Sequence, residues 1–234
     1  MARNLRLPRR PDETSQLAAA DSVVVIGLGR FGSALALELM AIKTEVLGID
    51  YNAEIVQSMN GKLTHVVRAD TTKEEALRQL DVTEFDRAVV GIGTDLEASL
   101  LTASHLVGFG LTNVWAKAVS QPHGRILDQL GVHHVIYPES DMGRRVAHLV
   151  RGAMLDYIQF EDDSAMVKTL APAEISGRRL GDTGVRRKYG VTVVAVHRRG
   201  EQFTYATADT VVDSGDIIVV FGRIADAERF SLLR

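Results

Sequence analysis

Apolar and polar residues follow a repeating order between residues 22 and 138. Short apolar runs, typical of buried strands, occupy residues 22–27, 45–50, 64–69, 87–91, 113–116 and 132–137. Amphipathic stretches separate these runs. The alternation predicts an α/β domain with a doubly wound parallel sheet of the Rossmann type, covered by helices on both faces.

Helix signals lie between the apolar runs. One helix face is formed by residues at spacings of four, four and three: Phe31, Leu35, Leu39 and Ile42. Thr72 and Glu75 have the spacing of a capping box, which predicts a helix that begins at Lys73. A further helix is predicted over residues 95–107.

The pattern changes after Pro138. Residues 141–158 fit one helix, and its apolar face is larger than a connector needs, so we expect it to pack on something outside its own domain. Beyond residue 165 the chain favours strands, at 166–170, 191–198, 203–207 and 216–221, with a short helix that ends at Gly190. We expect a small α+β domain here.

Composition narrows the classes of protein that the chain can belong to. The 234 residues carry a net charge of −3, which gives no bias toward nucleic acid, and no apolar run approaches the length of a membrane span. The absence of cysteine excludes disulfides, thiolate zinc sites and cysteine nucleophiles. Residues 1–21 are basic, and we expect a flexible leader, or a segment weakly attracted to an anionic membrane surface.

A glycine motif follows the first apolar run. Gly27 permits a tight turn, Gly29 lets the backbone approach a phosphate, and Gly32 allows close packing of the next helix. Asp50 ends the second apolar run, where a carboxylate can accept hydrogen bonds from both ribose hydroxyls and would repel a 2′-phosphate. The spacing predicts a dinucleotide-type site that disfavours NADP.

Charged residues near this motif extend the candidate site. Arg30 stands between the glycines, where it either grips a terminal phosphate or remains a surface arginine. Asp70, followed by Thr71, either approaches an adenine or caps a helix, and Lys117 either reaches a phosphate or is an exposed residue at a strand end. Two glycines after the fourth apolar run border the same crevice: Gly91 and Gly93.

Catalytic signatures are missing from the sequence. The histidines lack the spacing of a metal site, and His133 and His134 would point to opposite faces of a strand. No proton donor with a recognisable partner accompanies the nucleotide motif. We therefore expect a nucleotide sensor and not an enzyme; a small NAD-dependent oxidoreductase and an NAD(H) redox sensor remain the alternatives.

Several motifs together resemble the RCK (KTN) family, the cytosolic gating subunits of Trk- and Ktr-type potassium transporters. They are VIGLGRFG at 25–32, GID at 48–50, ADTT at 69–72, WAK at 115–117, GVHHVIYPE at 131–139 and DMG at 141–143. GRRL at 177–180 and DSGDIIVVFG at 213–222 resemble the RCK C-terminal domain. The resemblance adds Phe31, in the glycine loop, to the candidate ligand contacts.

This resemblance implies a domain plan. It consists of the leader at 1–21, a nucleotide-binding RCK N-terminal domain at 22–138, a crossover helix or linker at 139–160 and an RCK C-terminal domain at 161–234. It further implies a cytoplasmic protein, peripheral at the inner face of the plasma membrane. The expected partners are a membrane-embedded potassium transporter subunit and further copies of the chain, as homodimers assembled into an octameric ring.

The resemblance also implies ligands. ATP and ADP would bind at the glycine motif with different effects on the ring, and NAD(H) is the alternative. Arg30 would reach the terminal phosphate, and Glu139 would help to hold Mg²⁺ or Ca²⁺ at the dimer interface, unless it is an ordinary acid before a helix. Some relatives bind cyclic di-AMP in the C-terminal domain, but the sequence assigns no pocket for it; Arg186, Arg187 and Lys188 fit a solvated helix face.

Overall fold

The computed structural model describes residues 22–151, 153–160 and 163–233. The chain divides into two compact units, Met1–Glu139 and Ser140–Arg234. The basic leader expected at residues 1–21 lies outside the described residues. Each unit has its own hydrophobic core and is described separately below.

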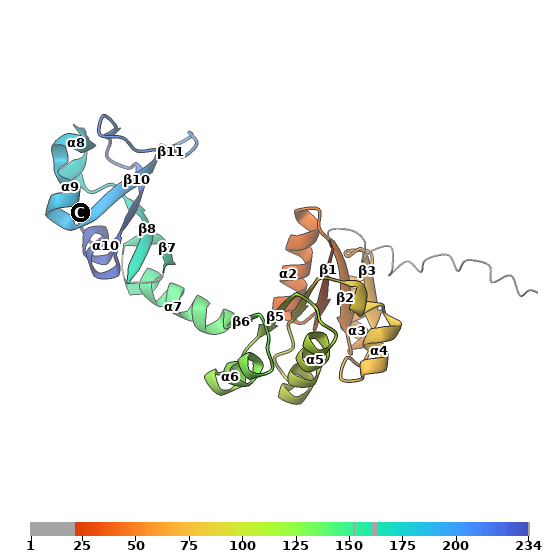
Figure 1. The fold of residues 1–234 in the computed structure, drawn as a ribbon. Helices are drawn as coiled ribbons and strands as arrows, with labels where there is room; N and C mark the ends of the chain where they lie inside the picture. The colour runs from red at the N-terminus through yellow and green to blue at the C-terminus, as the bar shows by residue number, and fades with distance from the viewer. Residues whose placement is uncertain (1–21, 152, 161–162, 234) are drawn as a thin grey trace, which may run out of the picture. The chain divides into compact units, whose positions relative to one another are not determined.

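The first unit is built on a parallel sheet with strand order β3-β2-β1-β4-β5-β6 (Figure 1). Its strands are β1 (Ser22–Ile26), β2 (Glu45–Asp50), β3 (His65–Arg68), β4 (Arg87–Val90), β5 (Asn113–Lys117) and β6 (His134–Ile136). The order reverses between β1 and β4. Ligands of doubly wound sheets bind at the carboxyl edge at such a reversal, which is where the glycine motif lies.

Helices cover both faces of this sheet. On one face α2 (Arg30–Ala41) and α3 (Ala53–Met59) pack against the side chains of Val23 and Val25. On the other face α4 (Glu74–Gln79), η1 (Val82–Glu84), α5 (Leu96–Gly108) and α6 (Gln121–Gln129) pack against Val24 and Ile26. Successive strand residues point to opposite faces, so β1 is buried on both sides, as its unbroken apolar run predicts.

The second unit contains a five-stranded antiparallel sheet in the order β11-β10-β13-β8-β7 and a small sheet of β12 and β9. The strands are β7 (Met154–Gln159), β8 (Ser164–Leu170), β9 (Arg178–Arg179), β10 (Val191–His197), β11 (Thr204–Tyr205), β12 (Val211–Val212) and β13 (Ile217–Arg223). Short helices join them: η2 (Ala173–Ile175), α8 (Leu180–Thr183), α9 (Val185–Tyr189) and α10 (Ile224–Ser231). Phe230 of α10 is fully buried in the core of this unit.

The predicted fold class is confirmed, a Rossmann-type parallel sheet followed by a small α+β domain. The six strands expected in the first unit all form, with ends that differ by no more than two residues from the expected ones. The predicted C-terminal strands also form, and Gly190 ends α9 in the left-handed conformation.

The helix expected over residues 141–158 is wrong in its second half. Helix α7 (Pro138–Arg151) begins earlier and ends at Arg151, and residues from Met154 onward form β7, which pairs with β8. A bulge between Met154 and Asp156 interrupts the alternation of β7. The interrupted alternation left spacings that match a helix as well as a strand.

The predicted capping box at Thr72 is also wrong. The residue that caps α4 is Lys73, with no hydrogen bond from its side chain, and α4 begins one residue later than expected. The Thr72 hydroxyl instead donates to Asp70 Oδ1 at 2.6 Å. The charged carboxylate of Asp70 is a strong acceptor, and the Thr72 hydroxyl turns toward it and not toward the N-terminus of α4.

Candidate nucleotide site at the carboxyl edge of the parallel sheet

The glycine loop has the geometry of a phosphate cradle. Gly27 has φ +85° and its N–H donates to the Ile49 carbonyl at 2.8 Å, so the turn out of β1 requires a glycine. A Cβ on Gly32 would overlap the Gly27 carbonyl, which explains the close approach of α2. Gly29, which precedes α2, has an ordinary φ of −63°, and a Cβ there would meet no protein atom. Neither strain nor protein packing requires a glycine at position 29, so the open space there fits a ligand.

Asp50 is tied to the same loop. Its Oδ2 accepts the Leu28 N–H at 2.6 Å and its Oδ1 accepts the Asn52 N–H at 2.8 Å. A carboxylate can accept about four hydrogen bonds, so each oxygen retains capacity for a ribose hydroxyl. The loop and the carboxylate are therefore already arranged around the place expected for a ribose.

Lys117, at the end of β5, meets Glu139, which lies in the first turn of α7 three residues after β6. Lys117 ends β5 with only 11% of its side chain exposed, and its Nζ lies 2.5 Å from Glu139 Oε1. Glu139 follows β6 and its side chain is 62% exposed. The hydrogen bond from Lys117 is the main cause that lowers the pKa of Glu139, and the charge of Arg30 contributes in the same direction.

Phe31 of the glycine motif and the two glycines after β4 lie close to Lys117 or to the glycine loop. The Lys117 ammonium lies 5.9 Å from the centre of the Phe31 ring, within the range of a cation–π contact. A Cβ on Gly93 would lie 3.2 Å from Lys117 Nζ, and a Cβ on Gly91 would lie 2.8 Å from the Gly27 carbonyl oxygen. A side chain at Gly91 would therefore collide with the glycine loop, whereas one at Gly93 would crowd the Lys117 side chain.

Arg30 is exposed at the first position of α2. Among the residues that the structure describes, no hydrogen bond or ion pair engages its guanidinium, which acts on Glu139 through space. The sequence did not predict that Lys117 and Glu139 pair. The predicted order of strands could have indicated this pair, because β5 and β6 are adjacent parallel strands whose carboxyl ends lie at one edge of the sheet.

Asp70 and Thr71 are engaged within the chain. Asp70 lies two residues beyond the end of β3, and its Oδ1 accepts both the N–H and the hydroxyl of Thr72, which together lower the pKa of Asp70. The Thr71 hydroxyl is buried against that of Thr102 at 2.8 Å. Of the two, only Asp70 still offers a side-chain atom to a ligand.

No group of three or more histidine, aspartate or glutamate side chains occurs within residues 22–151, 153–160 and 163–233 that could hold a metal ion. Glu139 therefore cannot build a cation site from the described part of a single chain. A cation at this residue would require ligands from outside it, such as a second copy or a phosphate.

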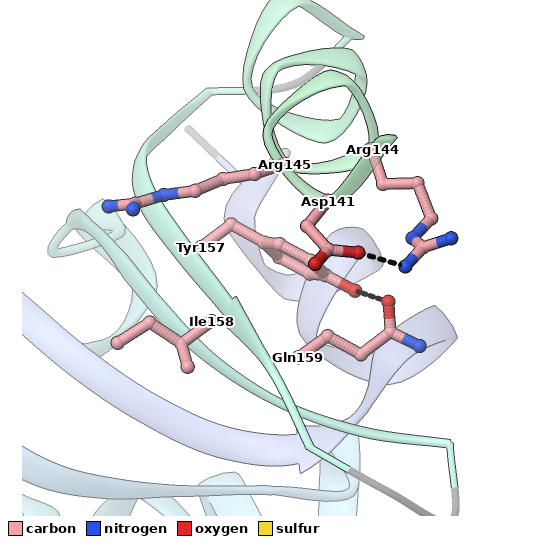
Figure 2. Close-up of a pocket in the computed structure, with 6 residues that line it drawn as sticks. All are labelled: Asp141, Arg144, Arg145, Tyr157, Ile158 and Gln159. Atoms are coloured by element: carbon pink, nitrogen blue, oxygen red, sulfur yellow. Dashed lines mark hydrogen bonds and ion pairs between the residues drawn. The ribbon is translucent and has the colours of Figure 1, made fainter. Parts of the chain in front are cut away.

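The second unit carries a pocket of about 480 Å³ between α7 and β7, lined by Asp141, Arg144, Arg145, Tyr157, Ile158 and Gln159 (Figure 2). Figure 2 shows Arg144 directed at Asp141, at 2.6 Å, and the Tyr157 hydroxyl directed at Gln159. Arg145 pairs with Asp156 at 2.5 Å. Each guanidinium group is thus paired with a carboxylate, and the geometry of the pocket assigns it no ligand.

The basic run of the second unit is also largely paired. Lys188 forms an ion pair with Glu174, and Arg186 Nε donates to the Thr192 hydroxyl at 3.0 Å. Arg186 and Arg187 line a cavity of about 780 Å³. These contacts support a partly solvated helix and assign no ligand to it.

The sequence matches two family models and several potassium uptake proteins. A TrkA-N domain model matches residues 23–138, and a TrkA-C domain model matches residues 165–233. The chain is 34% identical over 207 residues to the Ktr system potassium uptake protein C of Bacillus subtilis (strain 168), covering 88% of this chain and 94% of that protein. The chain belongs to the TrkA/Ktr family of potassium uptake proteins. This confirms the resemblance that the sequence motifs indicated.

Other relatives support the same family. The Ktr system potassium uptake protein A of Vibrio alginolyticus is 32% identical over 199 residues, covering 85% of this chain and 90% of that protein. The crystal structure of the GsuK RCK domain has the same fold, with a TM-score of 0.63, 17% identity and 92% of this chain covered. The match covers 48% of that GsuK chain, so this TrkA/Ktr protein spans about half of it.

No helix within residues 22–151, 153–160 and 163–233 is long and apolar enough to cross a bilayer.

Proposed function

We propose that this protein is a nucleotide-binding, non-enzymatic regulatory subunit of a potassium uptake system. The observation that carries the proposal is the preformed cradle at the carboxyl edge of the sheet, where the open position at Gly29 adjoins Asp50 and the Lys117–Glu139 pair. Family membership supports the transport system, because the relatives are potassium uptake proteins. Within the described residues the site offers groups that suit binding: the open position at Gly29, the Asp50 carboxylate and the guanidinium of Arg30.

Adenine nucleotides, ATP and ADP, are the ligands that the charges favour. Arg30, whose guanidinium is engaged by no hydrogen bond or ion pair among the described residues, lies at the N-terminus of α2, whose free N–H groups also favour phosphate. Lys117 adds a second cationic side chain near Phe31, already paired with Glu139. A γ-phosphate would add negative charge beside Arg30. We infer that ATP and ADP stabilise two conformations to different degrees, because a ligand shifts an equilibrium only by its difference in affinity for the two states.

A second copy of the chain would complete the site. Glu139 is largely exposed, and the described part of one chain places too few ligands beside it to hold a cation. We infer a homodimer, assembled further into an octameric ring, in which Mg²⁺ or Ca²⁺ binds between Glu139 and a terminal phosphate. The ring would act on a membrane-embedded potassium transporter subunit at the cytoplasmic face.

NAD(H) is the second candidate ligand. Asp50 can accept a ribose hydroxyl from either kind of nucleotide, and a GsuK channel structure with this fold, at a TM-score of 0.63 and 16% identity, is bound to NAD. A redox-sensing subunit, or an oxidoreductase, would follow if NAD(H) were preferred.

Calorimetry with ATP, ADP and NADH tests the proposal. Arg30→Ala is expected to weaken ATP about tenfold or more and ADP much less, because a charge-assisted hydrogen bond to a phosphate contributes about 1.5–3 kcal/mol. Asp50→Ala should weaken all three ligands. Arg125→Ala, at an exposed position of α6, is the matched control and should change none of them.

Three results would contradict parts of this proposal. Equal loss of ATP and ADP in Arg30→Ala removes this residue as the discriminator. Unchanged affinities in Asp50→Ala refute the site. A preference of the wild type for NADH, together with steady NADH oxidation in the presence of a carbonyl substrate, replaces the regulatory subunit by the enzyme.

A further inference from the structure

The loop that carries Asp70 is held by helix α5 at two points. The hydroxyls of Thr71 and Thr102 lie 2.8 Å apart and are buried, with 6% and 0% of the residues exposed. His105 Nε2 lies 3.0 Å from the Thr72 carbonyl oxygen. Because a carbonyl only accepts, Nε2 carries the hydrogen of this bond.

The two contacts belong to one face of α5. Positions 102 and 105 are three residues apart and therefore neighbours on the helix surface. Thr102 is anchored in the interior, and the ring of His105 stacks on Phe109 with centroids 6.4 Å apart. The loop at residues 70–72 is thus fixed against the body of the domain and not left to the solvent.

These contacts determine where the Asp70 carboxylate lies. Its Oδ1 accepts the Thr72 hydroxyl at 2.6 Å and the Thr72 N–H at 3.2 Å, and the carbonyl of the same Thr72 is the group that His105 holds. In the described part of the chain, the other oxygen, Oδ2, has only an ion-pair contact, with Lys73 Nζ at 3.8 Å. Oδ2 can therefore accept a hydrogen bond from a ligand.

Asp70 lies beside the nucleotide cradle. The neighbouring Ala69 N–H donates to the Asp50 carbonyl at 3.1 Å, and Asp50 is paired with Arg68 in the register of β2 and β3. Asp50 binds the glycine loop and is the expected partner of the ribose. Asp70 Oδ2 is therefore suited to accept a hydrogen bond from a donor on the base attached to that ribose.

We propose that Thr102 and His105 are positioning residues that fix Asp70 to accept the exocyclic amino group of adenine, and so set the base specificity of the site. The proposal rests on the proposed nucleotide-binding function. It assigns no direct ligand contact to Thr102 or His105. Both act through the loop at residues 70–72.

The test compares ADP with purine riboside 5′-diphosphate, which lacks only the amino group. We expect the wild type to bind ADP about tenfold more tightly, since a hydrogen bond to a charged group contributes about 1.5–3 kcal/mol. Thr102→Val removes the hydroxyl at nearly constant shape and should reduce this ratio about fivefold, the equivalent of about 1 kcal/mol. Thr102→Ser keeps the hydroxyl and should retain the wild-type ratio.

Two further variants complete the experiment. His105→Leu should reduce the ratio as Thr102→Val does, because it releases the Thr72 carbonyl. Thr112→Val, which removes an exposed hydroxyl elsewhere in the same unit, is the matched control and should leave the ratio unchanged. A ratio of two affinities does not depend on the folded fraction, so a purely structural effect of Thr102 or His105 would not change it.

The outcomes separate this inference from the proposed function. If the wild type prefers ADP and both Thr102→Val and His105→Leu lose the preference, the inference is supported. If the variants keep the wild-type ratio, or if the wild type binds both ligands equally well, the inference is overturned while nucleotide binding stands. If the wild type binds neither ligand, the proposed binding of ATP and ADP itself fails.

Discussion

The Lys117–Glu139 pair should respond unequally to the loss of each partner. Lys117 is nearly buried, whereas the Glu139 side chain is 62% exposed. Glu139→Ala leaves a buried ammonium without its counter-charge. Lys117→Met removes the charge that needed a partner and keeps the apolar stem. We therefore expect Glu139→Ala to lower the free energy of unfolding more than Lys117→Met does.

The size of the difference follows from the exposure of the pair. Breaking a fully buried pair costs about 3–5 kcal/mol, and an exposed pair contributes about 0–1 kcal/mol. Because the Glu139 side chain is mostly solvated, the cost should fall well below that of a fully buried pair. We expect Glu139→Ala to lower the free energy of unfolding by about 1.5 kcal/mol. For Lys117→Met we expect a change within about 0.5 kcal/mol.

Urea denaturation followed by tryptophan fluorescence measures this difference. Trp115 is the only tryptophan of the chain and lies in β5, two residues before Lys117, so it reports on the first unit. With an m-value of about 2 kcal/mol/M, Glu139→Ala should lower the midpoint by about 0.7 M. Lys62→Met, at an exposed position, is the control for loss of a lysine charge.

The pH dependence of the same pair gives a second check. The pKa of Glu139 is held below its ordinary value of 4.5, so the pair stabilises the fold fully above that pH and the contribution is lost as the pH falls through the lowered value. The gap between wild type and Glu139→Ala should therefore close in acid. Equal midpoints for Glu139→Ala and Lys117→Met at neutral pH would refute the reasoning.

Two further predictions concern the glycine loop and a buried histidine. Gly32→Ala should prevent stable folding, because its Cβ would overlap the Gly27 carbonyl. Gly29→Ala should leave the urea midpoint reported by Trp115 nearly unchanged and should weaken the affinity for ADP at least tenfold in calorimetry. A poorly folded Gly29→Ala would contradict this prediction. Burial lowers the pKa of His123, so the stability of the wild type should decrease as the pH falls below 6.5. His123→Asn can still accept the Val119 N–H and should flatten that dependence. Equal pH profiles of thermal unfolding for the wild type and His123→Asn would oppose this expectation.

The sequence alone determined the architecture of the first unit. Strand and helix periodicities are local properties, so they can be recognised in the sequence. The turn at Gly27 and the close packing of α2 at Gly32 each require a glycine, so the glycines themselves indicate both features. Asp50 was predictable for the same reason, since its distance from the glycines follows from one strand–helix–strand unit.

The tertiary structure alone decided which side chains engage one another. Residues 154–159 form a strand because β8 supplies their backbone partners, and the bulge at Met154 conceals the alternation. Thr71 is turned inward by Thr102, which is 31 residues away, and Lys117 is neutralised by Glu139, which is 22 residues away. Such contacts depend on the packing of distant segments, so no local pattern of Asp70, Thr71 or Lys117 could show which atoms remain free for a ligand.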